Sequence, residues 1–177
     1  RNGTVQLHDE TSRPPAGSTR DRVRVDGKFF RVGTQKFWVK GVTYGPFRTN
    51  SLGDPLPEPS QVDSDFQQLR ELGANTVRVH HAPPQWMLDK AGEHGFKVFV
   101  DTPFAKNRQF LNYQAVMKAG REAVRRDIRA CQRHPAVLAY IVANEIPPDV
   151  VRWLGHKRVE KYLDELVEIA KQEDPQG

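Results

Sequence analysis

The stretch His134–Pro147, HPAVLAYIVANEIP, decides the fold of this chain. Its seven residues from 136 to 142 are apolar, and the polar pair Asn144 and Glu145 follows them. A short apolar run that contains β-branched residues is typical of a parallel strand, which is buried on both faces. Polar residues just beyond such a strand lie where α/β enzymes place their chemistry. Glu145 is therefore a candidate general acid, because desolvation favours the protonated form of a carboxyl group.

Strand and helix patterns alternate through the rest of the chain. Asp26-Gly27 lies between alternating apolar segments and predicts a β-hairpin, and a turn at Gly33-Thr34 leads into a strand at 37–43. Further strands are predicted at 75–80, 96–101 and 136–142. Helices are predicted from a capping box at Ser60 to Gly73, from Pro83-Pro84 to Gly95, at 112–132 and at 155–173. A strand followed by a helix, four times over, predicts an α/β fold with a parallel sheet.

The composition is typical of a globular protein with one domain. The chain has 177 residues, of which 37% are hydrophobic and 28% charged, enough for one well-packed core. Residues 1–21 are polar and contain a Pro-Pro pair, so they are predicted to be a flexible arm or linker before a domain at 22–177. No apolar run approaches the ~20 residues that span a bilayer. Because the first residue is Arg1, we expect the native start to lie upstream.

The net charge is +5 and the sequence pI is about 9.5, a balance that also occurs in nucleic-acid-binding proteins. The basic residues are scattered, however, and acidic residues lie among them in every group. This interleaving is typical of solvated helix faces, so nucleic acid is not the expected partner.

Polar side chains gather at the predicted carboxyl ends of the strands. They are Tyr44, Arg78, His80, His81, Asp101, Asn144 and Glu145. Buried polar groups cost stability unless they pair, so the whole set favours a function, although Arg78 alone could simply pair with Asp101. A metal site is not expected, because adjacent strand residues such as His80 and His81 point to opposite faces and no HExxH or paired-cysteine spacing occurs. No glycine-rich phosphate fingerprint follows a strand, so no cofactor is expected.

These segments resemble the retaining glycoside hydrolases with a (β/α)8 barrel, the clan that includes the β-galactosidase, β-glucuronidase and cellulase families. An Asn-Glu pair that ends the fourth parallel strand is the acid/base motif of that clan. The stretches FFRVGTQKFWVKGVTYGPF, FQQLRELGANTVRVHH, HGFKVFVD and RRDIRACQRHPAVLAYIVANE resemble its hairpin and first four strands with the helices between them. The resemblance covers nearly all of residues 22–174. It implies the N-terminal half of a TIM barrel, about four βα units preceded by a β-hairpin.

The resemblance also implies a role for each strand-end residue. Glu145 would be the acid/base that protonates the leaving glycosidic oxygen, and Asn144 would bind the 2-hydroxyl of the sugar. Arg78 would orient the nucleophile and keep it ionised. The sugar site would be lined by His80, His81, Tyr44 and Asp101. Trp153, which follows Pro147-Pro148, is a candidate platform for a sugar ring, although packing under a loop would explain it equally well.

The chain departs from the clan at the nucleophile. A retaining enzyme needs a second carboxylate about 5–5.5 Å from the first, and in this clan that glutamate ends the seventh strand. The acidic residues after Glu145 lie in a turn or on the last predicted helix, and Asp101 is the one other acid at a strand end. We therefore expect half of a retaining glycoside hydrolase for β-linked saccharides, inactive alone, which needs a C-terminal half-barrel or self-association.

Two other functions remain open from the sequence. A non-catalytic carbohydrate-binding or scaffolding half-barrel attached to another enzyme would bind sugar without turning it over. A nucleic-acid-binding α/β domain would show binding that weakens steeply with salt.

Overall fold

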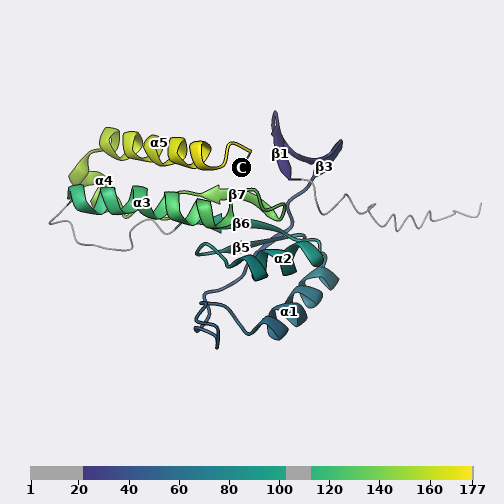
Figure 1. Cartoon of the computed structure of the whole chain (residues 1–177). Helices are drawn as coiled ribbons and strands as arrows, with labels where there is room; N and C mark the ends of the chain where they lie inside the picture. Colours follow the sequence, from purple (N-terminus) through teal and green to yellow (C-terminus); the bar gives the residue numbers. More distant parts are fainter. Residues whose placement is uncertain (1–21, 103–112, 177) are drawn as a thin grey trace, which may run out of the picture.

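A parallel sheet forms the centre of the structure, a computed structural model that describes residues 22–102 and 113–176 (Figure 1). Its strands, in spatial order, are β4 (Gly41–Thr43), β5 (Thr76–Val79), β6 (Lys97–Asp101) and β7 (Val137–Ile141). Each pairs in parallel with the next. The parallel strands predicted at 75–80, 96–101 and 136–142 are thereby confirmed, and the strand predicted at 37–43 is confirmed in its last three residues. The predicted arm at 1–21 and most of the connection between Asp101 and residue 112 lie outside the described residues.

Helices follow the strands in turn. They are α1 (Pro59–Glu71), α2 (Gln85–Glu93), α3 (Tyr113–Cys131), α4 (Pro148–Leu154) and α5 (His156–Glu173). Four of them match the predicted helices, whereas α4 follows a Pro-Pro pair at which only a turn was expected. Proline is favoured in the first turn of a helix, which explains why α4 begins at Pro148. Among the described residues, none of these helices combines the length and apolar character needed to cross a bilayer.

A separate antiparallel sheet precedes the parallel one. It consists of β1 (Val23–Asp26), β2 (Phe29–Val32) and β3 (Gln35–Phe37), in that spatial order. The predicted hairpin is confirmed, but the strand predicted at 37–43 is divided between β3 and β4. The reason is Asn75, whose side chain donates to the carbonyl of Trp38 and accepts from the amide of Lys40, each at 2.8 Å. These bonds hold the connecting backbone at the amino end of β5.

The capping box predicted at Ser60 is wrong. Helix α1 begins at Pro59 and has no side-chain cap. Glu58, the residue before it, instead accepts hydrogen bonds from the amide and the hydroxyl of Ser51 at 2.7 and 2.8 Å. Proline at the first helical position needs no amide partner, so the helix can start two residues earlier than a cap at Ser60 predicts.

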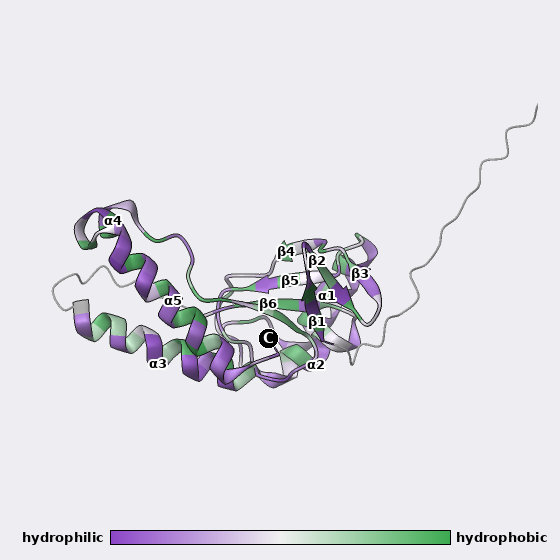
Figure 2. Ribbon diagram, turned by 90° about the horizontal axis from the view of Figure 1, so that it is seen from above, coloured by the Kyte–Doolittle hydropathy of each residue, from purple (hydrophilic) through white to green (hydrophobic). Residues whose placement is uncertain are grey.

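The core has two parts. The first lies between the parallel sheet and its helices, where Val77, Val79, Val98 and Val100 are fully buried against α1 and α2. Each such side chain stabilises the fold by about 1.5–3 kcal/mol relative to exposure. The second lies between α3 and α5, which run side by side and alternate between hydrophobic and hydrophilic residues along their length (Figure 2). Tyr140 of β7 contacts both parts and joins them.

The apolar spacing of the sequence predicts a buried side for each of the two long helices: Val116, Ala123, Val124, Ile128 and Cys131 on α3, and Val159, Tyr162, Leu163, Leu166, Val167 and Ala170 on α5. On α3, Val124, Ile128 and Cys131 are fully buried, as predicted, whereas Val116 and Ala123 are only partly buried. On α5, Tyr162 and Leu166 are buried, whereas Val167 is exposed and Ile169 takes its place in the core. The helical spacing allowed either residue, and the position of α3 selects Ile169.

A buried carboxylate ties the first described residues to the last helix. Arg22 donates to both oxygens of Asp174 at 2.7 and 2.8 Å, and the hydroxyl of Tyr140 donates to Oδ2 at 2.8 Å. Burial by itself raises the pKa of Asp174, but the bonds from Arg22 and Tyr140 outweigh it and hold that pKa below its ordinary value. The ionised carboxylate therefore stabilises the folded chain.

We expect Asp174→Asn to lower the free energy of unfolding by about 3 kcal/mol at pH 7, because Arg22 is left buried without a counter-charge. The stabilisation from Asp174 is present above the pKa of the unfolded chain, about 3.9, and is lost as the pH falls through the lower folded value. Urea unfolding of Asp174→Asn and of the parent at pH 7 and pH 3 should therefore show that their difference in free energy of unfolding is smaller at pH 3. The exposed Glu168→Gln is the control. An equal loss in both variants would contradict this account.

Cys131 should be unreactive in the folded chain. It is fully buried, and burial raises the pKa of its thiol to about 12. Since the thiolate is the reactive form, a thiol reagent at pH 8 should label the protein far more slowly in buffer than in 6 M guanidinium. Equal labelling rates would show that α3 does not pack as described.

Candidate functional site

The parallel register brings polar residues from three strands to one edge of the sheet. Arg78 lies in β5, Asp101 ends β6, and Asn144 follows β7 by three residues. In the register, Arg78 is opposite Phe99, and Asp101 is opposite Ile141. The alternation of strand side chains turns Arg78 away from the buried pair Val77 and Val79. Arg78 therefore lies on the face opposite the helix-covered core.

Arg78 and Asp101 form a two-point ion pair. Arg78 Nε donates to Asp101 Oδ1 at 2.9 Å, and Nη2 donates to Oδ2 at 2.7 Å. The side chain of Asp101 is 6% exposed and that of Arg78 is 31% exposed. The hydrogen bond to Asp101 is the main cause that raises the pKa of Arg78, so the guanidinium stays charged. Paired bonds of this kind fix orientation as well as charge.

Two further residues attach to this pair. Arg78 Nη2 also donates to Asn144 Oδ1 at 3.0 Å, and His80 Nδ1 lies 3.2 Å from Asp101 Oδ2. We call Arg78, His80, Asp101 and Asn144 the strand-end cluster. Because the amide oxygen of Asn144 accepts from Arg78, its N–H groups are directed elsewhere and can donate to a hydroxyl. The cluster thus presents a fixed cation and an oriented amide donor.

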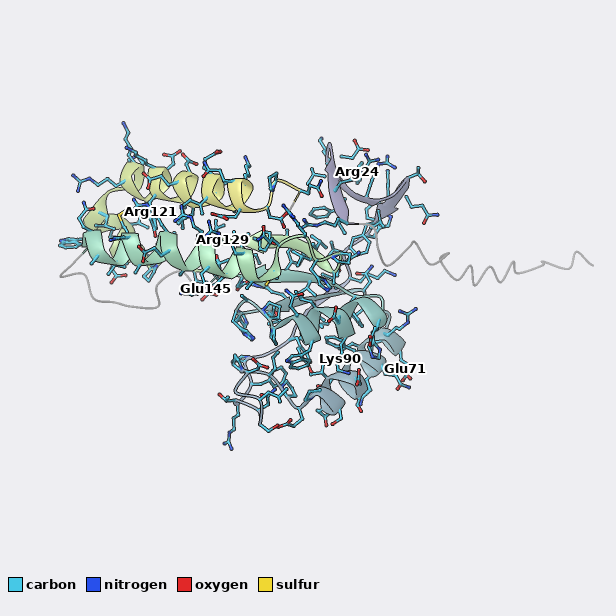
Figure 3. All side chains as sticks on the ribbon, viewed as in Figure 1. Arg24, Glu71, Lys90, Arg121, Arg129 and Glu145 are labelled. Carbon is cyan, nitrogen blue, oxygen red and sulfur yellow. The ribbon has the colours of Figure 1, made fainter. Side chains whose placement is uncertain are left out.

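Glu145 directly follows Asn144 of this cluster and is exposed; it is labelled in Figure 3. The desolvation expected from its place after an apolar strand is therefore not found in the described residues. Its backbone has a φ of 49°, a left-handed conformation that is uncommon for residues other than glycine. Its negative charge also favours the charged form of Arg78 and contributes to the raised pKa of that residue. The turn thus places a carboxylate near the guanidinium.

Tyr44 is not brought into the strand-end cluster. Its ring is buried against Phe66, with ring centroids 5.3 Å apart, and its hydroxyl donates to Asp65 of α1 at 2.7 Å. Burial is the main cause that raises the pKa of Tyr44. The sequence did not indicate Asp65 as the partner of Tyr44, because the two residues are 21 positions apart along the chain. Tyr44 thus joins β4 to α1 and does not face Arg78.

His81 and Trp153 also lie apart from the cluster. His81 Nε2 is buried and has no hydrogen-bond partner in the described part of the chain, and burial lowers the pKa of this imidazole. Trp153 lies on α4 and is 66% exposed. Within residues 22–102 and 113–176, no three His, Cys, Asp or Glu side chains are grouped so that they could hold a metal ion.

Phe47 is an aromatic residue at the same edge that sequence analysis did not single out. It follows β4 by four residues, is 38% exposed, and packs on Tyr44 with ring centroids 4.7 Å apart. An aromatic residue shortly after a strand end is the signal that could have indicated it. Its exposed ring adds an apolar surface at the edge where the cluster lies.

Comparison with known proteins places this chain in a family. The sequence profile described as Glucanosyltransferase matches residues 16–152. A β-glucuronidase of Bacteroides fragilis is 28% identical over 130 residues, which cover 70% of this chain and 18% of that protein. A 1,3-β-glucanosyltransferase of Schizosaccharomyces pombe is 28% identical over 142 residues, 74% of this chain and 27% of that protein.

Solved structures show the same fold. A β-glucuronidase from Ruminococcus gnavus in complex with a C6-substituted uronic isofagomine has a TM-score of 0.69 at 21% identity, over 88% of this chain and 26% of that one. Bacteroides uniformis β-glucuronidase 2 has a TM-score of 0.66 at 19% identity, and the match covers 88% of this chain and 19% of that one. The chain thus spans roughly a fifth to a quarter of the length of these relatives. Its four parallel strands correspond to part of a TIM barrel.

The match to the family covers most of the chain, and the fold agrees with the barrel of the related hydrolases. The chain belongs to the glucanosyltransferase family, within the clan of (β/α)8-barrel glycoside hydrolases.

Proposed function

We propose that this chain supplies the acid/base side of the active site of a retaining enzyme that acts on β-linked saccharides. The observation that carries the proposal is the bond from Arg78 to Asn144, which joins the end of β7 to the ion pair between β5 and β6. That bond orients the amide of Asn144 and holds the neighbouring Glu145 at the carboxyl edge of the sheet. Family membership supports the same substrate class.

In the proposed first step, Glu145 gives its proton to the glycosidic oxygen as the bond from that oxygen to the anomeric carbon breaks. A carboxylate nucleophile bonds to the anomeric carbon from the other side. The amide N–H of Asn144 donates to the 2-hydroxyl of the sugar, a contact that strengthens as positive charge develops on the ring. Arg78 holds the amide and keeps the nucleophile ionised.

In the second step, an oxygen of the acceptor bonds to the anomeric carbon and releases the nucleophile. Glu145, now a carboxylate, takes the proton of that acceptor. Water as the acceptor gives hydrolysis, and a sugar hydroxyl gives transfer to a new chain. The relatives include both kinds of enzyme by name, β-glucuronidases and 1,3-β-glucanosyltransferases. The exposure of Glu145 leaves room for either acceptor.

Asp101 is poorly suited to be the nucleophile. Both of its oxygens accept from Arg78, and its side chain is 6% exposed, so a sugar cannot reach it without breaking the pair. We therefore assign the nucleophile to a residue outside the described part of the chain. The outer strands β4 and β7 each pair with one strand in the described sheet, and such edges pair readily with further strands. A second half-barrel, or a second copy of this chain, would complete the site.

A non-catalytic saccharide-binding half-barrel is the second candidate. The observation in its favour is that Glu145 is exposed, without the desolvation that a general acid uses. It predicts sugar binding that does not depend on the Glu145 carboxylate.

We expect Glu145→Gln to lower turnover by about 10²–10⁴-fold on a β-linked saccharide, because the leaving oxygen is no longer protonated. The loss of rate in the first step should be smaller on an aryl β-glycoside whose leaving group is an acidic phenol, since that leaving group needs little protonation. Turnover is measured in the chain joined to any sequence that follows Gly177 in its gene, because we expect the chain alone to be inactive.

Glu160→Gln on α5 makes the same chemical change at an exposed position and should keep full activity. Turnover by Glu145→Gln equal to that of the parent on both substrates would defeat the assignment. Activity of residues 1–177 alone would show instead that the nucleophile lies within this chain.

Asp101→Asn should release Arg78 and Asn144 from their fixed positions. We expect kcat/KM to fall by about tenfold or more, because small misplacements of positioning groups are costly in rate. The free energy of unfolding should fall by about 1–3 kcal/mol, less than for a fully buried pair since Arg78 is partly exposed. Steady-state kinetics and urea unfolding measure the two effects. Unchanged kcat/KM together with lowered stability would show that the pair is structural only.

A further inference from the structure

One face of the antiparallel sheet carries a row of like charges. Arg24 of β1 is opposite Arg31 of β2, and Arg31 is opposite Lys36 of β3. Residues that are directly opposite in neighbouring strands project from the same face, with Cβ atoms about 5 Å apart. Three cations therefore cross the sheet side by side.

Two aromatic rings continue this face. Phe29 and Trp38 are exposed by 40% and 62%, and their rings meet edge to face with centroids 5.8 Å apart. The ammonium of Lys36 lies 3.9 Å from the centroid of Phe29 and 5.9 Å from that of Trp38. We call Arg24, Phe29, Arg31, Lys36 and Trp38 the cationic face.

The charges of the cationic face are incompletely neutralised. Asp26 pairs with Arg31, whereas in the described residues no carboxylate pairs with Arg24 or Lys36. Arg24 donates instead to the carbonyl of Gly33 at 3.2 Å. Like charges that are directly opposite in a sheet destabilise it. A bound anion would relieve that repulsion, and this charge complementarity defines the ligand that the face can accept.

The cationic face lies far from the strand-end cluster. The carbonyl of Trp38 accepts a hydrogen bond from the side chain of Asn75, and Asn75 immediately precedes β5. The cationic face is therefore at the amino end of the parallel sheet. Glu145 follows the carboxyl end of β7, about 15 Å away along the strands. Arg24 and Glu145 lie in separate regions of the molecule (Figure 3).

We propose that the cationic face is a second saccharide site, which binds an acidic glycan chain through its carboxylate groups. Arg24 and Lys36, which no carboxylate of the described residues neutralises, pair with anionic groups of the glycan beside the Arg31–Asp26 pair, and Trp38 stacks on the apolar face of a pyranose ring. A neutral glucan would leave the cations unpaired, so acidic sugars are favoured over neutral ones. The binding depends on no residue of the strand-end cluster and therefore stands apart from the proposed catalysis.

A single-stranded nucleic acid would also complement the charge, but the rings fit it poorly. Proteins that follow such strands stack successive bases on several aromatic side chains. Here the ammonium of Lys36 lies 3.9 Å from the centroid of Phe29 and 5.9 Å from that of Trp38, so among the described residues of this face Trp38, 62% exposed, offers the more accessible ring. One ring beside a row of cations matches a chain of acidic sugars better than a run of bases.

Binding is tested on the whole chain with fluorescently labelled oligogalacturonate, a neutral β-1,3-glucan oligosaccharide of equal length, and a DNA oligonucleotide of equal charge. Arg24→Gln with Lys36→Gln should weaken oligogalacturonate binding by about tenfold, since each exposed ion pair contributes up to about fivefold. Trp38→Ala should weaken it by about threefold or more. The matched control, Arg158→Gln with Lys161→Gln on α5, removes the same charge from another exposed surface and should bind as the parent does.

Circular dichroism and melting temperature check that each variant folds. The proposal is supported if oligogalacturonate binds most tightly, if added NaCl weakens it, and if Glu145→Gln leaves it unchanged. It is overturned if the DNA binds as tightly as the acidic glycan, if the neutral glucan does, if the control variant loses as much affinity, or if no probe binds at 50 mM NaCl.

Discussion

The parallel pairing of β5 with β6 and of β6 with β7 is the constraint on which the site depends. Because all three strands end at one edge, a basic residue of one strand and an acidic residue of the next meet there, and Arg78 holds Asp101 at two points. A buried Asp101 without that guanidinium would cost several kcal/mol. The register therefore makes the ion pair possible, and the ion pair makes the polar edge stable enough to hold Asn144.

The elements of the fold were largely predictable from the sequence because their periodicity is strong. Short apolar runs that end in a polar residue identified β5, β6 and β7, and the spacing of Val124, Ile128 and Cys131 identified the buried side of α3. Capping was less predictable. A serine pattern competes with a preceding proline for the first helical position, and in α1 the proline prevails. The choice of Ile169 over Val167 required the position of a neighbouring helix.

The candidate site was predictable in its residue types but not in its contacts. Strand ends suggested Arg78, His80, Asp101 and Asn144, and these four do meet. Tyr44 has the same kind of sequence position, yet its hydroxyl bonds to a carboxylate of α1. The direction in which a strand-end side chain points depends on the face of the strand it occupies and on the residues that pack there. Those residues lie in distant parts of the chain.

The left-handed backbone at Glu145 has a consequence for how this edge responds to heat. In a residue other than glycine, that conformation costs roughly 1–2 kcal/mol of folding free energy. Glu145 and its neighbour Asn144 are exposed, so few packed side chains oppose relaxation of the turn. On warming, this turn should be the first part of the edge to open, in a local event that leaves β5 and β6 folded. Glu145, the proposed proton donor, would then move away while the guanidinium of Arg78 and the carboxylate of Asp101 remained in place.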